Sequence, residues 1–242
     1  MPKAKGAARK AAGETLRADL LAAALPHVAF DGWSEAVLRS AAKDLDVDPA
    51  LAANAFPGGG RELIAFYSQE IDRRCLEALE ALPLEEMKVR DKIHTGVMTR
   101  LELLEPDKEA VRRGLSFLAL PHNAPLAAKL LYRTVDALWY AAGDRATDYN
   151  FYTKRGLLAG VYSSTLLFWL NDSSADYAAT HGFLDRRIAE VLKIGGRLGK
   201  GMAGLMNFPD RLAARMTQPG ARGPLAGLRS GLRGGFRAGR FR

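Results

Sequence analysis

Apolar residues recur every three or four positions along most of the chain, the spacing that places them on one face of an α-helix. In the segment 174–194, for example, Tyr177, Leu184 and Ile188 fall on one such stripe. Ala and Leu are abundant while β-branched residues are sparse, which favours helices over strands. The pattern therefore predicts an all-α protein.

Capping residues, prolines and glycines divide this pattern into separate helices. Asp48 followed by Pro49 is typical of a helix start, Ser34 is a candidate N-cap, and Asp31-Gly32 is typical of a helix end. The predicted helices span residues 15–30, 34–45, 48–56, 61–82, 84–104, 107–120, 123–142, 149–170 and 174–194. After residue 194 the composition changes abruptly to Gly and Arg, which predicts the end of the packed domain.

Charge is unevenly distributed along the 242 residues, whose formal net charge is +8. Residues 1–17 contain five Lys or Arg and one Glu, and residues 193–242 contain 11 Lys or Arg and one Asp. The intervening body has more acidic than basic residues. We therefore expect the two ends, rather than the body, to attract an anionic surface.

Targeting and membrane signals are weak. The basic N-terminus runs into Ala and Gly instead of an apolar stretch, so we expect no signal peptide. We interpret residues 1–13 as a disordered bacterial N-terminus, and the alternative is a short mitochondrial presequence. The best apolar stretch, residues 157–170, is shorter than the roughly 20 residues that cross a bilayer. The single cysteine, Cys75, excludes an internal disulfide and favours a reducing compartment.

Residues 20–70 contain a set of positions with a familiar spacing. The set comprises Ala24 to Phe30, Gly32-Trp33, Leu38, Ala41-Ala42, Val47, Phe56 and Glu62-Leu63. It resembles the N-terminal helix-turn-helix domain of TetR-type regulators. This resemblance implies an architecture and does not by itself imply DNA binding.

The chemistry of this unit argues against DNA binding. A recognition helix needs Lys, Arg, Asn or Gln at exposed positions to reach phosphates and base edges. Residues 44–60 contain no Lys or Arg, and Asp44, Asp46 and Asp48 surround the turn, where they would repel a phosphate backbone. We therefore interpret the helix-turn-helix as vestigial and expect no DNA partner.

Polar and aromatic residues are densest over residues 136–155, at a predicted helix-loop-helix junction. Capping by Thr147 or Asp148 explains the backbone there, but it leaves the crowding of Trp139 and Tyr152 near an arginine unexplained. The distinctive residues between positions 120 and 187 are Leu120-Pro121-His122-Asn123, Asp136, Trp139, Gly143-Asp144, Thr147-Asp148, Asn150, Tyr152-Thr153, Arg155, Leu157-Leu158-Ala159, Tyr162, Thr165, Asp172-Ser173-Ser174, Asp176, Thr180, Phe183-Leu184 and Arg187. Together they resemble the ubiquinone-biosynthesis accessory family (the ninth member of the COQ set), over about residues 16–195.

This resemblance implies a non-catalytic lipid-binding protein with a TetR-like fold that needs no cofactor. It implies that isoprenoid quinone intermediates are presented to the di-iron demethoxyubiquinone hydroxylase. The partner-binding residues that it implies are Leu138, Asp148, Phe151, Tyr152 and Arg155. Leu138 and Phe151 differ in type from the commonest family residues. A homodimer follows from the fold analogy alone.

The helix predicted over residues 149–170 is apolar on nearly all sides after its first turn, so it should be central and buried. The small residues Ala127, Ala128, Ala159 and Gly160 could leave room between helices for a lipid tail; the alternative is a filled core. The lipid-binding residues that we predict are Leu118, Leu131, Val135, Leu158, Tyr162, Leu166, Trp169, Leu184 and Ile188.

The C-terminal tail combines apolar and basic residues. Such a pattern is typical of an amphipathic helix that lies on a membrane surface. The predicted membrane-binding residues are Arg197, Leu198, Lys200, Met202, Leu205, Met206, Phe208, Arg211 and Arg215. The Arg/Gly run 222–242 could bind anionic lipid headgroups or RNA, and the interleaved apolar residues favour lipid.

No catalytic or metal-binding motif stands out. His27, His94, His122 and His181 lack the spacing that places two ligands on one helical face, and no nucleotide-binding loop or nucleophile elbow occurs. The sequence thus predicts a basic flexible N-terminus (1–14), a TetR-like unit (15–70), a lipid-binding and dimerisation domain (71–194) and a membrane-associating tail (195–242). We expect the protein to be cytoplasmic and peripheral to the inner membrane, or on the matrix side in a eukaryote. The alternative is a TetR-type regulator with a hydrophobic effector pocket.

Overall fold

The structure is a computed structural model that describes residues 2–144 and 149–206, with side chains described for residues 12–144 and 152–193. No β-strand occurs in these ranges, as the sequence predicts. The chain separates into two units, residues 1–192 and residues 193–242. The following paragraphs concern the first unit.

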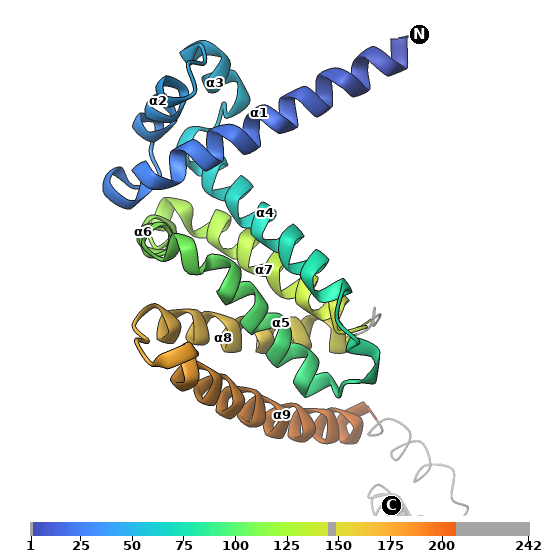
Figure 1. The fold of residues 1–242 in the computed structure, drawn as a ribbon. Coiled ribbons are helices and arrows are strands. Elements are labelled where there is room, and N and C mark those ends of the chain that lie inside the picture. Colours follow the sequence, from blue (N-terminus) through green and yellow to red (C-terminus); the bar gives the residue numbers. More distant parts are fainter. Residues whose placement is uncertain (1, 145–148, 207–242) are drawn as a thin grey trace, which may run out of the picture. The chain divides into compact units, whose positions relative to one another are not determined.

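Helices α1 (Pro2–Asp31), α2 (Glu35–Asp44) and α3 (Pro49–Ala55) pack together at the N-terminal end of α4 (Gly59–Glu80) (Figure 1). Asp48 accepts a hydrogen bond from the Ala50 backbone N–H at 2.7 Å and caps α3, as predicted. Gly32, at φ +67°, ends α1 at the predicted position. This part of the chain has the helix-turn-helix arrangement that the sequence predicts.

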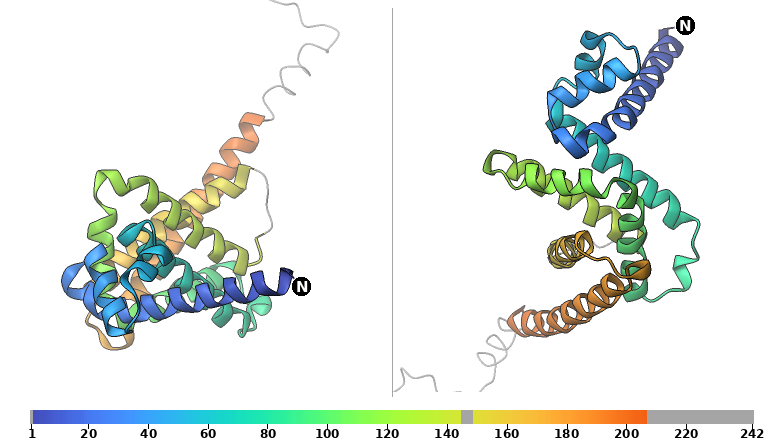
Figure 2. Two further views of the ribbon diagram at one scale, coloured as in Figure 1. Left: turned by 90° about the horizontal axis from the view of Figure 1, so that it is seen from above. Right: turned by 60° about the vertical axis from the view of Figure 1, so that its left-hand side comes forward.

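The remaining helices of the first unit form a bundle. They are α5 (Val89–Leu104), α6 (Lys108–Leu118), α7 (Ala124–Ala141), α8 (Tyr149–Leu170) and residues 178–192 of α9 (Ala178–Met206), whose later residues belong to the second unit. Helix α7 contacts α4, α5 and α8 (Figures 1 and 2). None of the described helices has both the length and the apolar composition needed to cross a membrane.

Several predicted boundaries are wrong. Helix α1 begins at Pro2 instead of residue 15, and α9 continues to Met206 instead of ending at residue 194. The helix predicted over 84–104 is divided into a short 3-10 helix (Leu84–Glu86) and α5, because Met87 and Lys88 adopt extended backbone angles. Ser34 precedes α2, but its hydroxyl makes no capping hydrogen bond.

Helix α8 is less completely buried than its apolar composition predicts. Leu158, Val161 and Trp169 lie in the core, whereas Leu167 is 57% exposed. Helix α8 contacts α7 and α5, and Phe168 stacks on Phe183 of α9, but these contacts leave Leu167 uncovered, so composition alone overstates the burial of α8.

Asp172 fixes the corner between α8 and α9. Its carboxylate accepts hydrogen bonds from the Ser174 backbone N–H at 2.8 Å and from the backbone N–H and hydroxyl of Thr180 at 2.9 and 2.6 Å. The hydrogen bonds from Thr180 and Ser174 hold the pKa of Asp172 well below its usual range. The carboxylate thus stays ionised and holds the start of α9.

Gly60 is where α4 meets the segment that follows α1. A Cβ placed on Gly60 would lie 2.2 Å from the carbonyl oxygen of Trp33, a backbone atom that no side-chain rotation can move away. Glycine is therefore required by this close approach.

We predict that Gly60→Ala lowers the free energy of unfolding by more than about 2 kcal/mol, because the backbone must shift to relieve the clash. Gly160→Ala is the matched control: it lies within α8 with nothing within 4 Å of the added Cβ, so it should stabilise the helix by about 0.5–1 kcal/mol. Urea denaturation followed by circular dichroism measures both. Equal stability of the two variants would contradict the close approach.

Candidate functional site: an apolar cavity with a buried polar side

A cavity of about 330 Å³ lies between helices of the bundle, with one wall from the segment that follows α1. Most of its lining is apolar: Trp33, Ile64, Leu104, Ala110, Val111, Gly114, Leu115, Leu118, Ala119, Ala127, Leu130, Leu131, Leu166 and Leu167. Its polar lining is Tyr67, Ser68, Arg100, Thr134, Tyr162 and Ser163. Such a cavity suits an apolar molecule with a small polar group.

The polar lining is organised around the buried guanidinium of Arg100. Its Nε donates to Asp72 Oδ1 at 2.9 Å, and its other nitrogens donate to the hydroxyls of Tyr162 and, at 3.4 Å, Ser68. The Thr134 hydroxyl donates to Asp72 at 3.0 Å from the far side. The ion pair thus links α4, α5, α7 and α8 through hydrogen bonds.

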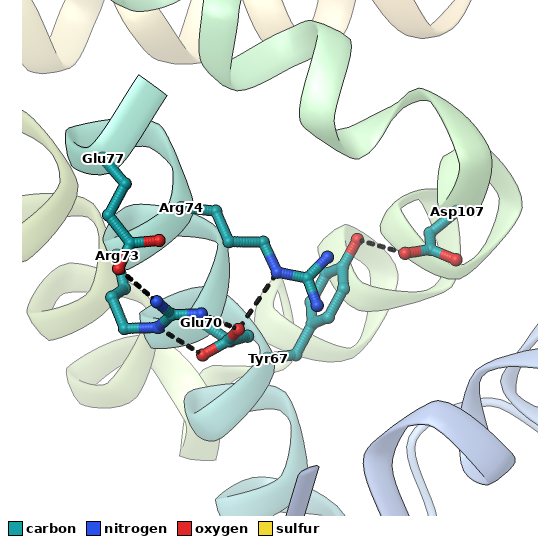
Figure 3. A network of polar contacts seen from close by, with 6 residues as sticks. All are labelled: Tyr67, Glu70, Arg73, Arg74, Glu77 and Asp107. Atoms are coloured by element: carbon teal, nitrogen blue, oxygen red, sulfur yellow. Dashed lines mark hydrogen bonds and ion pairs between the residues drawn. The ribbon is translucent and has the colours of Figure 1, made fainter. Parts of the chain in front are cut away.

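Tyr67 belongs to a second polar group beside the cavity (Figure 3). Its hydroxyl donates to Asp107 at 3.2 Å, and burial, followed by the Asp107 charge, raises the pKa of Tyr67 well above its ordinary value. Burial also raises the pKa of Asp107. Next to Tyr67 along α4, Glu70 pairs with both Arg73 and Arg74. The hydrogen bond to Asp107 holds the Tyr67 ring in the cavity wall.

Of the predicted lipid-binding residues, Leu118, Leu131, Tyr162 and Leu166 line the cavity. The others are buried core residues that do not line it: Val135, Leu158, Trp169, Leu184 and Ile188. Helical periodicity identifies the buried face of each helix, but it does not distinguish residues that face a void from residues that face another side chain. Among the small residues, Ala127 lines the cavity, whereas Ala128 and Gly160 are exposed.

Sequence reasoning missed the walls formed by α4 and α5, and it found only Leu118 of the wall formed by α6. Trp33 is one of the missed residues. Its indole N–H donates a hydrogen bond to the Ala110 carbonyl at 3.0 Å, and the centroids of the Trp33 and Tyr67 rings are 5.3 Å apart. One available signal was the apolar stripe of α6, in which Ala110, Gly114 and Leu118 recur every four residues. The contribution of Arg100 had no sequence signal, because Asp72 lies 28 residues away in the chain.

The partner-binding residues implied by the family resemblance do not form one surface. Leu138 and Arg155 are buried, and Arg155 pairs with Asp136 at 2.6 Å and with Asp144 at 3.4 Å. Tyr152 is 70% exposed. Asp148 and the Phe151 side chain fall outside the described part of the chain. Arg155 therefore organises the α7–α8 junction from within.

The predicted membrane-binding residues fall outside the described side chains. Arg197, Leu198, Lys200, Met202, Leu205 and Met206 belong to the helical backbone of α9. Phe208, Arg211 and Arg215 lie beyond the described residues, as does the Arg/Gly run 222–242.

Two observations bear on reactive groups. His94 and His181, distant in sequence, have ring centroids 5.2 Å apart, but among the described residues no group of three His, Cys, Asp or Glu could hold a metal ion. Burial raises the pKa of the Cys75 thiol to about 11, so it remains protonated at neutral pH.

The fold is that of a TetR-type regulator. The chain is similar to the TetR transcriptional regulator from Nitrosomonas europaea, with a TM-score of 0.61 and 26% identity over 74% of this chain and 98% of that one. This likeness confirms the TetR-like, all-α fold class predicted from the sequence.

Sequence comparison identifies proteins that this chain resembles. Residues 124–195 match the COQ9 family. The chain is similar to the ubiquinone biosynthesis protein COQ9 of Bos taurus (38% identical) and of Homo sapiens (36% identical), in each case over 75% of this chain and 59% of the relative. The COQ9 protein of Drosophila melanogaster is 30% identical over 77% of this chain and 58% of its own length. The predicted resemblance to the COQ9 family is therefore confirmed, and the chain spans about 59% of the length of these relatives.

We predict that Asp72→Leu lowers the free energy of unfolding by about 3–5 kcal/mol, because it leaves Arg100 buried without its counter-charge. The double variant Asp72→Leu/Arg100→Met should recover much of this loss, since it replaces the pair with apolar side chains. Urea denaturation of both single variants and of the double variant measures the coupling. Additive losses would show that the two groups do not interact.

Proposed function

We propose that this chain is a non-catalytic, lipid-binding accessory protein of ubiquinone biosynthesis. It takes an isoprenoid quinone intermediate into the cavity and offers it to the di-iron demethoxyubiquinone hydroxylase. The observation that carries the proposal is an open, mainly apolar cavity of about 330 Å³ in a chain similar to proteins named for ubiquinone biosynthesis.

The energy of lipid transfer supports this proposal. Each methylene moved from water to an apolar environment contributes about 0.8 kcal/mol. A few isoprene units in contact with residues such as Leu118, Leu131 and Leu166 therefore give useful affinity. The affinity does not need to be high, because the ligand must be released to the next protein.

The titratable groups of the cavity support a binding role over catalysis. Burial raises the pKa values of Tyr67 and Tyr162, so neither hydroxyl can act as a general base near neutral pH. Arg100 cannot lose its proton in this range and is engaged by Asp72.

A role in DNA binding receives no such support. Asp44, Asp46 and Asp48 are exposed around the turn between α2 and α3, and α3 contains no Lys or Arg. These carboxylates would repel the phosphates that a regulator must contact. We therefore do not extend the activity named for the Nitrosomonas europaea regulator to this chain.

The proposed partner surface lies around the α7–α8 junction. Tyr152 is exposed there, and tyrosines with one apolar and one polar end are typical of binding hot spots. Asp148 and Phe151 stay part of this proposal from the sequence. A homodimer and a location peripheral to the inner membrane, on the matrix side in a eukaryote, complete it; the relatives are named as mitochondrial.

We predict that Ala127→Phe abolishes the co-purification of an isoprenoid lipid, because the added ring fills the cavity next to Leu131. Native mass spectrometry after gentle purification measures the bound mass. Ala128→Phe is the matched control, since Ala128 is the next residue of α7 but is exposed. Retention of lipid by Ala127→Phe, or its absence from the unmodified chain, would contradict the proposed function.

For the tail, we predict that replacing Arg197, Arg211 and Arg215 with Gln weakens binding to vesicles that contain anionic lipid. Each basic residue near such a surface contributes about 1 kcal/mol, so the loss should be at least 10-fold. Vesicle co-sedimentation at low and high salt measures it. The charge-matched control replaces the exposed residues Arg61, Arg112 and Arg113 of the first unit with Gln. This control should change vesicle binding little.

A further inference from the structure

Hydrogen-bonding groups form one buried side of the cavity, and the exposed residues of its lining are apolar. Arg100 and Tyr162 are each 5% exposed, and Thr134 is 2% exposed. In contrast, Ala119 and Leu167 line the same cavity but are exposed to solvent. A ligand that enters past Ala119 and Leu167 therefore meets apolar side chains before it reaches these buried hydrogen-bonding groups.

The buried side carries hydrogen-bond donors. A guanidinium has five N–H groups, and the bonds from Arg100 to Asp72, Tyr162 and Ser68 use three of them. Tyr162 accepts a hydrogen bond from Arg100, and its own O–H can be donated to a ligand. Burial raises the pKa of Tyr162, which keeps that hydrogen in place. The buried side is therefore suited to a ligand that brings an oxygen acceptor.

The charge of this side restricts the ligand further. Among the cavity-lining residues that the structure describes, Arg100 alone is charged, and Asp72 lies 2.9 Å from its Nε. The pair leaves no net positive charge. A phosphate would thus enter a low-dielectric site without a counter-charge, which is costly, whereas a neutral carbonyl or ether oxygen carries no such penalty.

The volume of the cavity limits how much of a ligand it can enclose. Its volume of about 330 Å³ is at the lower end of the range of roughly 300–1,000 Å³ typical of small-molecule sites. It has room for a substituted ring and the first part of a tail. A long polyisoprenoid chain must continue outside, and the half-buried or exposed apolar lining residues, such as Leu118, Leu131 and Leu167, suit that chain.

We propose that the cavity binds its ligand head first. A neutral ring with carbonyl or ether oxygens accepts hydrogen bonds from Arg100 and Tyr162 at the buried side, and the hydrocarbon tail leaves past Leu167. This orientation rests on the proposed function. It specifies which end of the lipid the cavity recognises and explains why the cavity rejects an anionic headgroup. It makes Tyr162 and Arg100 determinants of ligand specificity.

The test compares two probes that share a six-membered ring and a ten-carbon tail. One is a dimethoxy-methyl-benzoquinone, whose ring carries oxygen acceptors, and the other is decylbenzene, whose ring carries none. Calorimetric titration of the full chain gives the affinity for each. Tyr162→Phe should weaken quinone binding about 3- to 10-fold, since it removes one hydrogen bond and keeps the ring. Asp72→Leu/Arg100→Met should weaken it about 10-fold or more.

Decylbenzene provides the internal control. Both variants should bind it within about twofold of the unmodified chain, which shows that the cavity is still formed. Tyr132→Phe, a change at an exposed tyrosine of α7 that does not line the cavity, should leave both affinities unchanged. If the two probes lose affinity equally, or if neither variant weakens the quinone, head-first binding is wrong.

A second measurement addresses orientation directly. A bulky dye on the far end of the quinone tail should be tolerated, whereas the same dye on the ring should abolish binding. The reverse result would overturn the proposal, as would tighter binding of a short-chain phosphatidic acid than of the quinone. If the unmodified chain binds neither probe, the proposed function itself fails. If it binds both with no effect of Tyr162→Phe or Asp72→Leu/Arg100→Met, only the head-first orientation fails.

Discussion

The bundle depends on one buried ion pair, Arg100 with Asp72, and on the hydroxyls that complete it. Asp72 belongs to α4 and Arg100 to α5. The hydroxyl of Thr134 in α7 donates a hydrogen bond to Asp72, and the hydroxyl of Tyr162 in α8 accepts one from Arg100. Four helices thus meet at one set of directional bonds. A buried pair need not add stability over apolar side chains, but it penalises any helix shift that would leave a charge unpaired.

This constraint has a consequence for the cavity. An apolar core tends to close around empty space, because voids lose dispersion contacts. Here the hydrogen bonds of Arg100 fix the separation of the surrounding helices, and the small side chains Ala110, Gly114 and Ala127 cannot fill the space between them. The same group that holds the helices apart also faces the interior, so architecture and ligand recognition share a residue.

The helix-turn-helix unit has a structural connection to this cavity. Trp33 bonds to Ala110 of α6 and contacts Tyr67 of α4, and Gly60 lets the backbone of α4 approach Trp33 closely. The unit therefore contributes a wall of the cavity through Trp33. This contact gives the unit a role in the present protein that does not require a DNA partner.

The sequence by itself determined the helical class, the TetR-like arrangement and the capping of α3 by Asp48. These features follow from local periodicity, capping chemistry and a distinctive set of residues. Only the tertiary structure decided that Leu138 and Arg155 are buried and that Val135 or Leu184 face side chains instead of a void. The pairing of Arg100 with Asp72 belongs to the same group. Each depends on how two or more helices are placed in three dimensions, and periodicity within one helix contains no information about its neighbours.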